Sequence, residues 1–209
     1  MKALLINGSP HLQGCTKRAL QEVERILNEN GIETAWLETG TKDIRGCIGC
    51  YYCVTNHKCV FNDIVNESVP LLEEADAVIV GTPTYYAGPN GQLHSFLDRF
   101  FFSTSASVNK AMKVGATVVS SRRAGSTSAF DDINKYFTIS SMPIASSTYW
   151  NEVHGFSKED VERDLEGLQT LRNLANNIAF MLRAFKAQKD KDGGYPVQER
   201  NHHTNFFQK

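Results

Sequence analysis

The sequence predicts an α/β protein, a doubly wound five-stranded parallel sheet in the order 2-1-3-4-5 with helices on both faces. Short apolar runs alternate with longer segments whose apolar residues recur every three or four positions, the pattern of strands alternating with helices. The apolar runs end at Gly, Pro, Asn or Ser, which mark turns. With 209 residues, 41% of them hydrophobic, the chain is long enough for one well-packed core. We therefore expect a single domain over 1–209, with a cysteine-rich loop at 41–61 and a polar tail at 190–209.

The first half of the chain contains three of the expected strands. Lys2–Asn7 is a continuous apolar run ended by Gly-Ser-Pro, as for a strand buried on both faces. A helix is expected at Thr16–Glu29, where an apolar stripe is followed by the helix-ending pair Asn-Gly. Ile32–Leu37 is the second strand and Asn62–Glu74 the second helix. Ala75–Val80 is the third strand, and Gly-Thr-Pro ends it.

The second half repeats this alternation. Gly91–Phe102 has helical spacing, and Ala111–Ser120 is the fourth strand. Ser126–Tyr136 is expected to be a helix and Met142–Ser147 the fifth strand. Leucines and other apolar residues over Lys158–Lys186 form one helical stripe, which predicts a single long helix.

Charge and composition exclude several classes of protein. Lys+Arg 22 against Asp+Glu 23 gives a formal charge of −1, so no global field attracts nucleic acid or an anionic membrane. No apolar run approaches the roughly 18–20 residues that span a bilayer. The N-terminal apolar run stops at Gly8, too short for a signal peptide, which favours a cytoplasmic protein with reduced thiols. Five cysteines in such a protein indicate metal or redox chemistry before disulfides. No Gly-x-Ser-x-Gly elbow supports a hydrolase.

The loop from Gly8 to Thr16 is a candidate anion site. It joins the first strand to the first helix, where backbone N–H groups and the helix dipole favour an anion, and Ser9 and Thr16 add hydroxyls. It is not a P-loop, because Cys15 stands where the lysine is required, and Pro10 replaces the second glycine of Gly-x-Gly-x-x-Gly. We expect a phosphate monoester bound without a metal; the alternative is a plain turn.

Two further loops follow the third and fourth strands. The loop at 81–89 contains Tyr85 and Tyr86 in a turn stiffened by Pro and Gly, a surface suited to a flat aromatic cofactor or to packing over the strand end. The loop at 120–125 contains Arg122 and Arg123, which either balance charge on a reduced cofactor or are solvated. Since the first and third strands flank the switch point of a 2-1-3-4-5 sheet, we expect their loops to meet there.

The cysteine-rich loop has four cysteines within thirteen residues, Cys47, Cys50, Cys53 and Cys59. Short Cys-x2-Cys spacing folds a turn around a compact [4Fe–4S] cluster, which needs four thiolates. Zinc also accepts four thiolates, although structural zinc sites usually hold two separated pairs. The third alternative is a set of reduced cysteines that line the cofactor pocket without a metal.

These motifs resemble the flavodoxin-like NAD(P)H-dependent FMN reductases, and most of all the iron–sulfur flavoprotein family. The resemblance covers nearly the whole chain and rests on these segments: Asn7–Pro10, Gly14–Thr16, the four cysteines with Asn62-Asp63, Ala75-Asp76, Gly81–Tyr85, Leu97–Arg99, Arg122–Gly125, Tyr149–Asn151 and Thr204–Phe206. Family members usually have Gly-Asn-Thr where this chain has Gly14-Cys15-Thr16, and often Asp-Asp at Asn62-Asp63.

The resemblance implies FMN as the cofactor, with the flavin itself performing the chemistry and no catalytic side chain required. The phosphate would lie on Ser9, His11, Gly14, Cys15 and Thr16. The ring would lie against Pro83, Thr84, Tyr85, Tyr86 and Gly88, with Ser121, Arg122, Arg123 and Gly125 closing one edge. Cys47, Cys50, Cys53 and Cys59 would hold the cluster, if one is present.

The implied function is an FMN-dependent oxidoreductase. It would pass electrons from NAD(P)H or a ferredoxin-like donor to a quinone, another flavin or a small acceptor. Such proteins are commonly homodimers or homotetramers, and the cysteine segment and the tail are the candidate contacts. Two alternatives stay open: a flavodoxin-type electron carrier without turnover, which the charge of −1 disfavours because carriers tend to be acidic, and a zinc-stabilised interaction protein.

Overall fold

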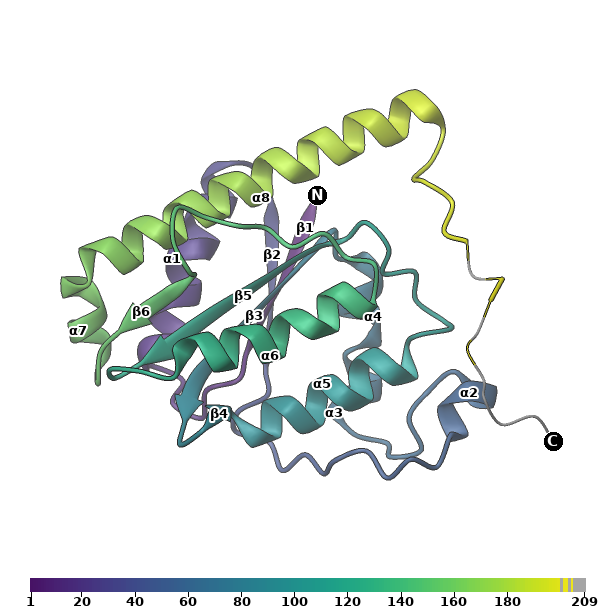
Figure 1. Cartoon of the computed structure of the whole chain (residues 1–209), viewed down its shortest axis with the longest axis horizontal. Coiled ribbons are helices and arrows are strands. Elements are labelled where there is room, and N and C mark those ends of the chain that lie inside the picture. Colours follow the sequence, from purple (N-terminus) through teal and green to yellow (C-terminus); the bar gives the residue numbers. More distant parts are fainter. Residues whose placement is uncertain (200, 203, 205–209) are drawn as a thin grey trace.

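The computed structural model describes residues 1–199, 201, 202 and 204, which form a parallel sheet between two layers of helices (Figure 1). The parallel strands lie in the order β2 (Glu33–Glu38), β1 (Lys2–Asn7), β3 (Ala77–Tyr85), β5 (Val114–Ser121) and β6 (Glu152–His154). Counted along the chain, these strands have the order 2-1-3-4-5, which confirms the predicted α/β fold class. A sixth short strand that the sequence did not predict, β4 (Gly88–Pro89), pairs antiparallel with the end of β3.

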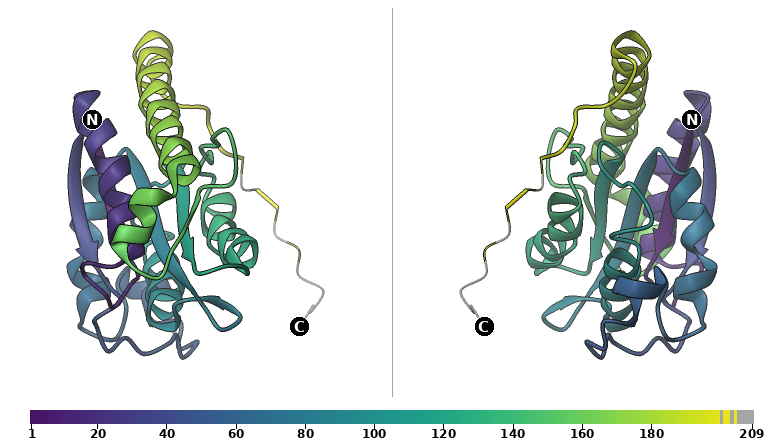
Figure 2. Two further views of the ribbon diagram at one scale, coloured as in Figure 1. Left: turned by 90° about the vertical axis from the view of Figure 1, so that its left-hand side faces the viewer. Right: turned by 90° about the vertical axis from the view of Figure 1, so that its right-hand side faces the viewer.

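Alternate residues of each central strand enter different cores. Ala3 and Leu5 of β1 pack with α1 (Cys15–Glu29) and α8 (Leu165–Asp192) on one face of the sheet. Leu4 and Ile6 pack with α5 (Gly91–Ser103) and α6 (Ser126–Ile139) on the other. Figure 2 shows the sheet edge-on between these layers. Because both faces are covered, the central strands are apolar without alternation, as the sequence indicated.

The fifth strand lies elsewhere than predicted. It was expected at Met142–Ser147, but the only ladder contact there is a bridge between Ile144 and Gly115, and the strand is β6, at Glu152–His154. Pro143 has no N–H to donate to a ladder, which weakens pairing in the expected segment. The pairing partner of β6 is the carboxyl end of β5, from Val119 to Ser121.

Two helices predicted as continuous are broken. The segment Asn62–Glu74 divides into α3 (Ile64–Glu67) and α4 (Val69–Glu74), with a proline in the first turn of α4. The stripe at Lys158–Lys186 divides at Asp164 into α7 (Lys158–Arg163) and α8. The Asp164 backbone is not helical (ψ 73°), and its carboxylate accepts hydrogen bonds from the N–H groups of Gly167 and His154.

Several boundaries also differ from prediction. The loop at 41–61 contains a short helix, α2 (Tyr52–Asn56). Strand β3 runs from Ala77 through Tyr85, so Gly81–Tyr85 are strand rather than loop, and β5 begins at Val114 instead of Ala111. Residues 205 and 206 of the resemblance lie outside the described residues, as does part of the predicted tail. Within the described part of the chain, no helix combines the length and apolar character needed to cross a lipid bilayer.

Candidate functional site

A cleft of about 830 Å³ lies at the carboxyl edge of the sheet. Its lining comes from the carboxyl ends of β3 and β5 and from the loops after β1, β5 and β6: Ser9–Thr16, Pro83–Tyr85, Ser120–Arg122 and Gly155–Glu159. In Figure 1, β4, β6 and α7 gather at this end of the molecule. Open α/β sheets bind ligands at this edge, at the point where the strand order reverses.

Hydrogen bonds fix the conformation of the loop between β1 and α1. The Gly14 N–H donates to the His11 carbonyl (2.9 Å), and the His11 N–H donates to Ser9 Oγ (3.2 Å). The hydroxyls of Thr16 and Ser120 share a hydrogen bond of 2.8 Å, which ties this loop to the end of β5. Helix α1 begins at Cys15 after an uncapped glycine, so its first N–H groups have no intrahelical acceptor. Unpaired N–H groups of this kind are the donors that the predicted anion site requires.

Cys15 lies in this loop as a free, half-buried thiol. Burial raises the pKa of Cys15, and the nearby carboxylates of Asp160 and Glu159 raise it further, although a backbone hydrogen bond opposes the shift. The thiol is therefore neutral at pH 7, so no negative charge on Cys15 repels an anion in this loop.

The other side of the cleft carries buried hydroxyls. Thr84 Oγ1 and Ser121 Oγ are both buried, and neither has a hydrogen-bond partner in the protein. A buried polar atom without a partner is costly, and it is commonly explained by a ligand. Tyr85, 40% exposed, and Arg122 also line the cleft. These atoms fit the polar edge and the flat face of an aromatic cofactor.

The structure brings together ten of the fourteen predicted cofactor residues. Those in the lining are Ser9, His11, Gly14, Cys15, Thr16, Pro83, Thr84, Tyr85, Ser121 and Arg122. Tyr86, Gly88, Arg123 and Gly125 are not in the lining. Tyr86 is fully exposed at the tip of the β3–β4 hairpin with φ 31°, and Gly125 starts α6 with φ 89°.

Sequence reasoning missed the segment Gly155–Glu159, which closes the cleft after β6. It was missed because the fifth strand was placed about ten residues too early, so the loop at its carboxyl end was not considered. Pro10, Leu12, Gln13 and Ser120 also line the cleft and were not singled out.

The four cysteines line a separate, small pocket. Cys47, Cys50, Cys53 and Cys59 are all free thiols, and they share this pocket with side chains of α5. None of them lines the cleft, which contradicts the interpretation in which reduced cysteines surround the cofactor. The short helix α2 lies at the opposite end of the molecule from β4 and β6 (Figure 1).

The four thiols give this pocket the number of donors that either a [4Fe–4S] cluster or a zinc ion takes. Among the described residues no three Cys, His, Asp or Glu side chains converge closely enough to hold one metal ion. The enclosed space is only about 20 Å³, so the loop must widen to receive a cluster. Burial raises the pKa of Cys53, and the three neighbouring cysteines raise it further against an opposing backbone hydrogen bond.

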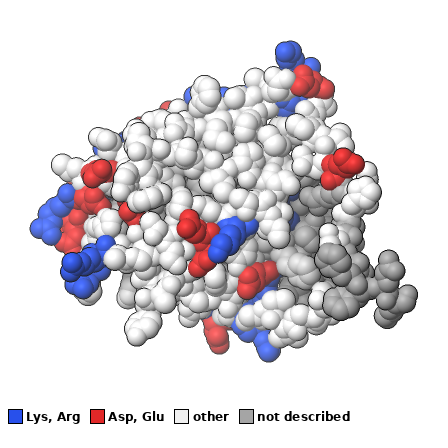
Figure 3. Space-filling view, viewed as in Figure 1, with Lys and Arg blue, Asp and Glu red and all other residues white. Residues whose placement is uncertain are grey.

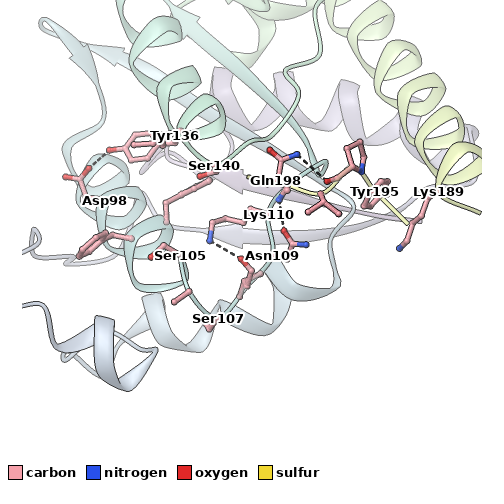
Figure 4. A pocket seen from close by; sticks show the side chains of 18 residues that line it. Asp98, Ser105, Ser107, Asn109, Lys110, Tyr136, Ser140, Lys189, Tyr195 and Gln198 are labelled. Atoms are coloured by element: carbon pink, nitrogen blue, oxygen red, sulfur yellow. Dashed lines mark hydrogen bonds between the residues drawn. The ribbon is translucent and has the colours of Figure 1, made fainter. Parts of the chain in front are cut away.

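A third pocket, of about 870 Å³, lies away from the carboxyl ends of the strands and shares no lining residue with the cleft (Figure 4). It is lined by the end of α5, the segment 105–111, α6 and residues 195–198. Tyr136 donates a hydrogen bond to Asp98 at its rim, and burial together with this carboxylate raises the pKa of Tyr136. The pocket contains none of the predicted site residues.

Charges on the face shown in Figure 3 are mixed, with basic and acidic groups lying beside one another. This distribution agrees with the formal charge of −1 and shows no extended patch of one sign on that face. It does not suggest a nucleic-acid surface there.

Residues 1–156 match the family model of the NADPH-dependent FMN reductases. The chain belongs to this family. Among its FMN-binding oxidoreductases, the chain is most like the iron–sulfur flavoproteins. One from Methanocaldococcus jannaschii is 32% identical over 196 residues, covering 89% of this chain and all of the relative. A second from the same organism is 31% identical, covering 88% of this chain and 98% of the relative.

Solved structures with low sequence identity show the same fold. RosB, crystallised with bound 8-demethyl-8-formylriboflavin-5'-phosphate, has a TM-score of 0.71 at 13% identity over the whole of this chain and 95% of its own. A WrbA-like flavodoxin from Agrobacterium tumefaciens has a TM-score of 0.61 at 17% identity, covering 88% of this chain and 98% of its own. These likenesses confirm the flavodoxin-like fold.

Proposed function

We propose that this protein is an FMN-dependent oxidoreductase that takes electrons from NAD(P)H or a ferredoxin-like donor. It passes them to a quinone, another flavin or a small oxidised acceptor. The observation that carries the proposal is the cleft itself. In a chain of the FMN reductase family, the predicted phosphate loop and the end of β3 line one cavity at the switch point.

The phosphate end of FMN fits the loop after β1. Ser9, His11 and Thr16 lie around the uncapped start of α1, where N–H groups and the helix dipole favour a dianion without a metal. Gly14 matters for its size: a Cβ there would lie 2.9 Å from the His11 Cβ and crowd the loop. Cys15, where the family usually has Asn, contributes its N–H rather than an amide side chain.

The ring end fits the hydroxyl side of the cleft. The unpartnered hydroxyls of Thr84 and Ser121 would orient the polar edge of the ring, and Tyr85 would shield one face from water. Arg122 would supply positive charge beside the reduced ring. When bound, FMN supplies hydride and single-electron transfer, so the protein needs no acid or base of its own. Tyr86, Gly88, Arg123 and Gly125 stay proposed as an outer edge of the site.

We further propose that Cys47, Cys50, Cys53 and Cys59 hold a [4Fe–4S] cluster. Four thiols on one short segment provide the donor set that such a cluster needs, and the curated relatives are named iron–sulfur flavoproteins. Zinc is the weaker alternative because structural zinc sites usually hold two separated Cys-x2-Cys pairs, whereas these four cysteines lie on one short segment.

The electron carrier without turnover is the second candidate function. The near-neutral charge disfavours it, because a carrier docks to its partners through a strongly charged surface. Steady-state NAD(P)H oxidation with a quinone separates the two. Bound flavin with no turnover for any donor and acceptor would favour the carrier.

Self-association belongs to the proposal as well. The cysteine segment presents exposed apolar side chains, among them Ile48, Tyr51 and Val54. Phe156 is 86% exposed although it lines the cofactor cleft, and Tyr86 is fully exposed nearby on the sheet edge. We propose that a second copy of this chain covers such surfaces in a homodimer or homotetramer.

The deciding experiment is anaerobic purification followed by absorbance spectra and analysis of FMN, iron, sulfide and zinc. We expect a yellow-brown protein with one FMN per chain, four iron and four sulfide per chain if the cluster is present, and NADH- or NADPH-dependent reduction of a quinone. A T16V variant should lose FMN, whereas T138V, in a surface turn of α6, should retain it. A colourless chain that takes up no FMN would contradict the proposal.

A further inference from the structure

Two sequence motifs of no assigned role, Asn62-Asp63 and Leu97-Asp98-Arg99, meet beside the cysteine pocket. The Arg99 guanidinium, on α5, is 2% exposed and forms a bidentate pair with Asp63, at 2.8 Å from Nη1 and 2.9 Å from Nη2. Nη1 also donates to the Arg45 carbonyl (3.2 Å). The remaining donor, Nε, points to the Sγ of Cys59 at 3.2 Å.

Hydrogen bonds hold both partners of the contact between Arg99 and Cys59: Asn66 holds the backbone of Cys59, and Asp63 holds the Arg99 guanidinium. The Cys59 N–H donates to Asn66 Oδ1 (2.9 Å), and Asn66 Nδ2 returns a hydrogen bond to the Cys59 carbonyl (3.0 Å). The carboxylate of Asp63 is itself held, because it caps α3 by accepting from the Val65 N–H (3.1 Å). The guanidinium therefore has little freedom to turn away from the sulfur.

A second donor on α5 lines the same pocket one turn later. The Ser103 hydroxyl is buried and has no hydrogen-bond partner in the protein, and residues four apart lie on one helix face. Arg99 and Ser103 thus present an N–H and an unpaired O–H to the pocket that the four cysteines line. A neutral thiol is a weak acceptor, whereas thiolate and sulfide sulfurs carry negative charge.

We propose that Arg99, assisted by Ser103, tunes the cysteine-bound cluster by hydrogen-bonding to its sulfurs. This inference rests on the cluster of the proposed function. A [4Fe–4S] cluster that accepts one electron gains one negative charge, and a buried cation with an aligned N–H stabilises that reduced state more than the oxidised one. An arginine guanidinium stays protonated in proteins, so the positive charge of Arg99 is fixed. Arg99 is a positioning residue that acts through Cys59, and it raises the reduction potential of the cluster.

The test compares one-electron midpoint potentials of the cluster by spectroscopic titration of anaerobic protein. In D63N/R99Q the buried pair is neutral, so neither charge is left unpaired, and D63N alone is its reference. We expect the reduced-to-oxidised ratio at a fixed potential to fall about tenfold from D63N to D63N/R99Q, a shift of about 59 mV. R99K keeps the positive charge but loses the planar set of guanidinium N–H donors. We expect R99K and S103A each to lower the reduced-to-oxidised ratio about threefold.

R45Q is the matched control, because it also removes a cation beside Phe61, but one that forms no contact with a cysteine sulfur in the described part of the chain. We expect its ratio to stay within twofold of wild type. Iron content and far-UV circular dichroism are recorded for every variant. If D63N/R99Q does not fold, R99K and S103A decide the question.

Three outcomes would overturn the inference. The first is that cluster-loaded variants of Arg99 and Ser103 have the wild-type potential, which would assign Arg99 a structural role alone. The second is that R45Q shifts the potential as much as they do. The third is wild-type protein that holds FMN but no iron or sulfide, which would remove the cluster and leave the FMN part of the proposed function standing.

Discussion

Gly40 packs directly against the backbone of the loop after β1, which lines the cleft, and this close approach leaves no room for a side chain. A Cβ on Gly40 would lie 2.2 Å from the Ser9 carbonyl carbon and 2.4 Å from its oxygen. Both are backbone atoms, so the crowding is relieved only if the loop after β1 moves. We expect G40A to weaken FMN binding at least tenfold and to destabilise the fold by about 1–3 kcal/mol.

The control for G40A is G91A, because a Cβ on Gly91 meets nothing within 4 Å. FMN affinity follows from flavin fluorescence quenching, and stability from urea unfolding of the flavin-free chain. Equal FMN affinity in G40A and wild type would show that the loop after β1 does not carry the phosphate.

Removing the buried hydroxyl of Thr84 or Ser121 should weaken FMN binding without lowering the stability of the flavin-free chain. Because they have no partner in the protein, T84V and S121A should leave the flavin-free chain as stable as wild type, or slightly more so. Each should weaken FMN binding about five- to tenfold, equivalent to about 1 kcal/mol for one hydrogen bond. Thr117 is the contrast, since its hydroxyl already donates to Asn134 (2.7 Å). T117V should destabilise the chain and leave FMN affinity unchanged.

At the scale of elements, Glu22 joins α1 to α8. Its carboxylate accepts hydrogen bonds from Arg18 (3.1 Å) and Arg25 (2.8 Å) of its own helix and from Arg172 of α8 (3.0 Å). Burial opposes the charge, but these three guanidinium groups outweigh it and lower the pKa of Glu22 to about 2. The Glu22 carboxylate is thus charged at neutral pH and becomes protonated only as the pH approaches 2.

This pKa sets a pH window for stability. A carboxyl group with a lowered folded-state pKa stabilises the fold fully above its unfolded pKa, near 4.5, and loses that contribution as pH falls toward 2. We expect E22Q to lower the free energy of unfolding at pH 7 by about 2–3 kcal/mol and the difference from wild type to shrink between pH 4.5 and pH 2. Urea unfolding at pH 7, 4.5 and 3 measures the difference in free energy of unfolding between E22Q and wild type. E29Q, which breaks an exposed pair with Arg25, should change stability little.

The elements also show what local sequence could and could not predict. Strands β1, β2, β3 and β5 and helices α1, α5 and α6 were found because both faces of the sheet are covered and the apolar periods are undisturbed. Strand β6 was missed because it has three residues and only Val153 faces the core. The break at Asp164 depends on its carboxylate meeting the His154 N–H ten residues away, a tertiary contact that leaves the apolar stripe intact.

The same limit applies to the site. The phosphate loop and the end of β3 are contiguous motifs, so the sequence placed them at one sheet edge through topology alone. The separation of the cysteine pocket from the cleft depends on how the loop at 41–61 packs against α5, and no local pattern encodes that. The Arg99–Cys59 contact joins residues forty positions apart and is visible only in three dimensions.

At the scale of the whole molecule, the cleft and the cysteine pocket have no lining residue in common, and α2 lies far from the β4 and β6 end (Figure 1). The apolar side chains that the cysteine segment exposes would be costly to leave in water, unless another copy covers them. We therefore expect the wild-type protein to have a solution mass two or four times 23.3 kDa by light scattering. The double variant I48S/V54S, which leaves all four cysteines in place, should halve that mass.

The control for this variant is F180S, because Phe180 is 72% exposed on α8 and lines neither the cleft nor the cysteine pocket. If the cysteine segment is the contact, F180S keeps the wild-type mass, and I48S/V54S still binds FMN because its substitutions lie outside the cleft. A wild-type protein that is monomeric, or an I48S/V54S variant with unchanged mass, would show that no second copy covers this segment. The exposed side chains would then be free to meet a separate electron donor or acceptor, and the double variant should instead slow reduction by a ferredoxin-like donor more than reduction by NAD(P)H.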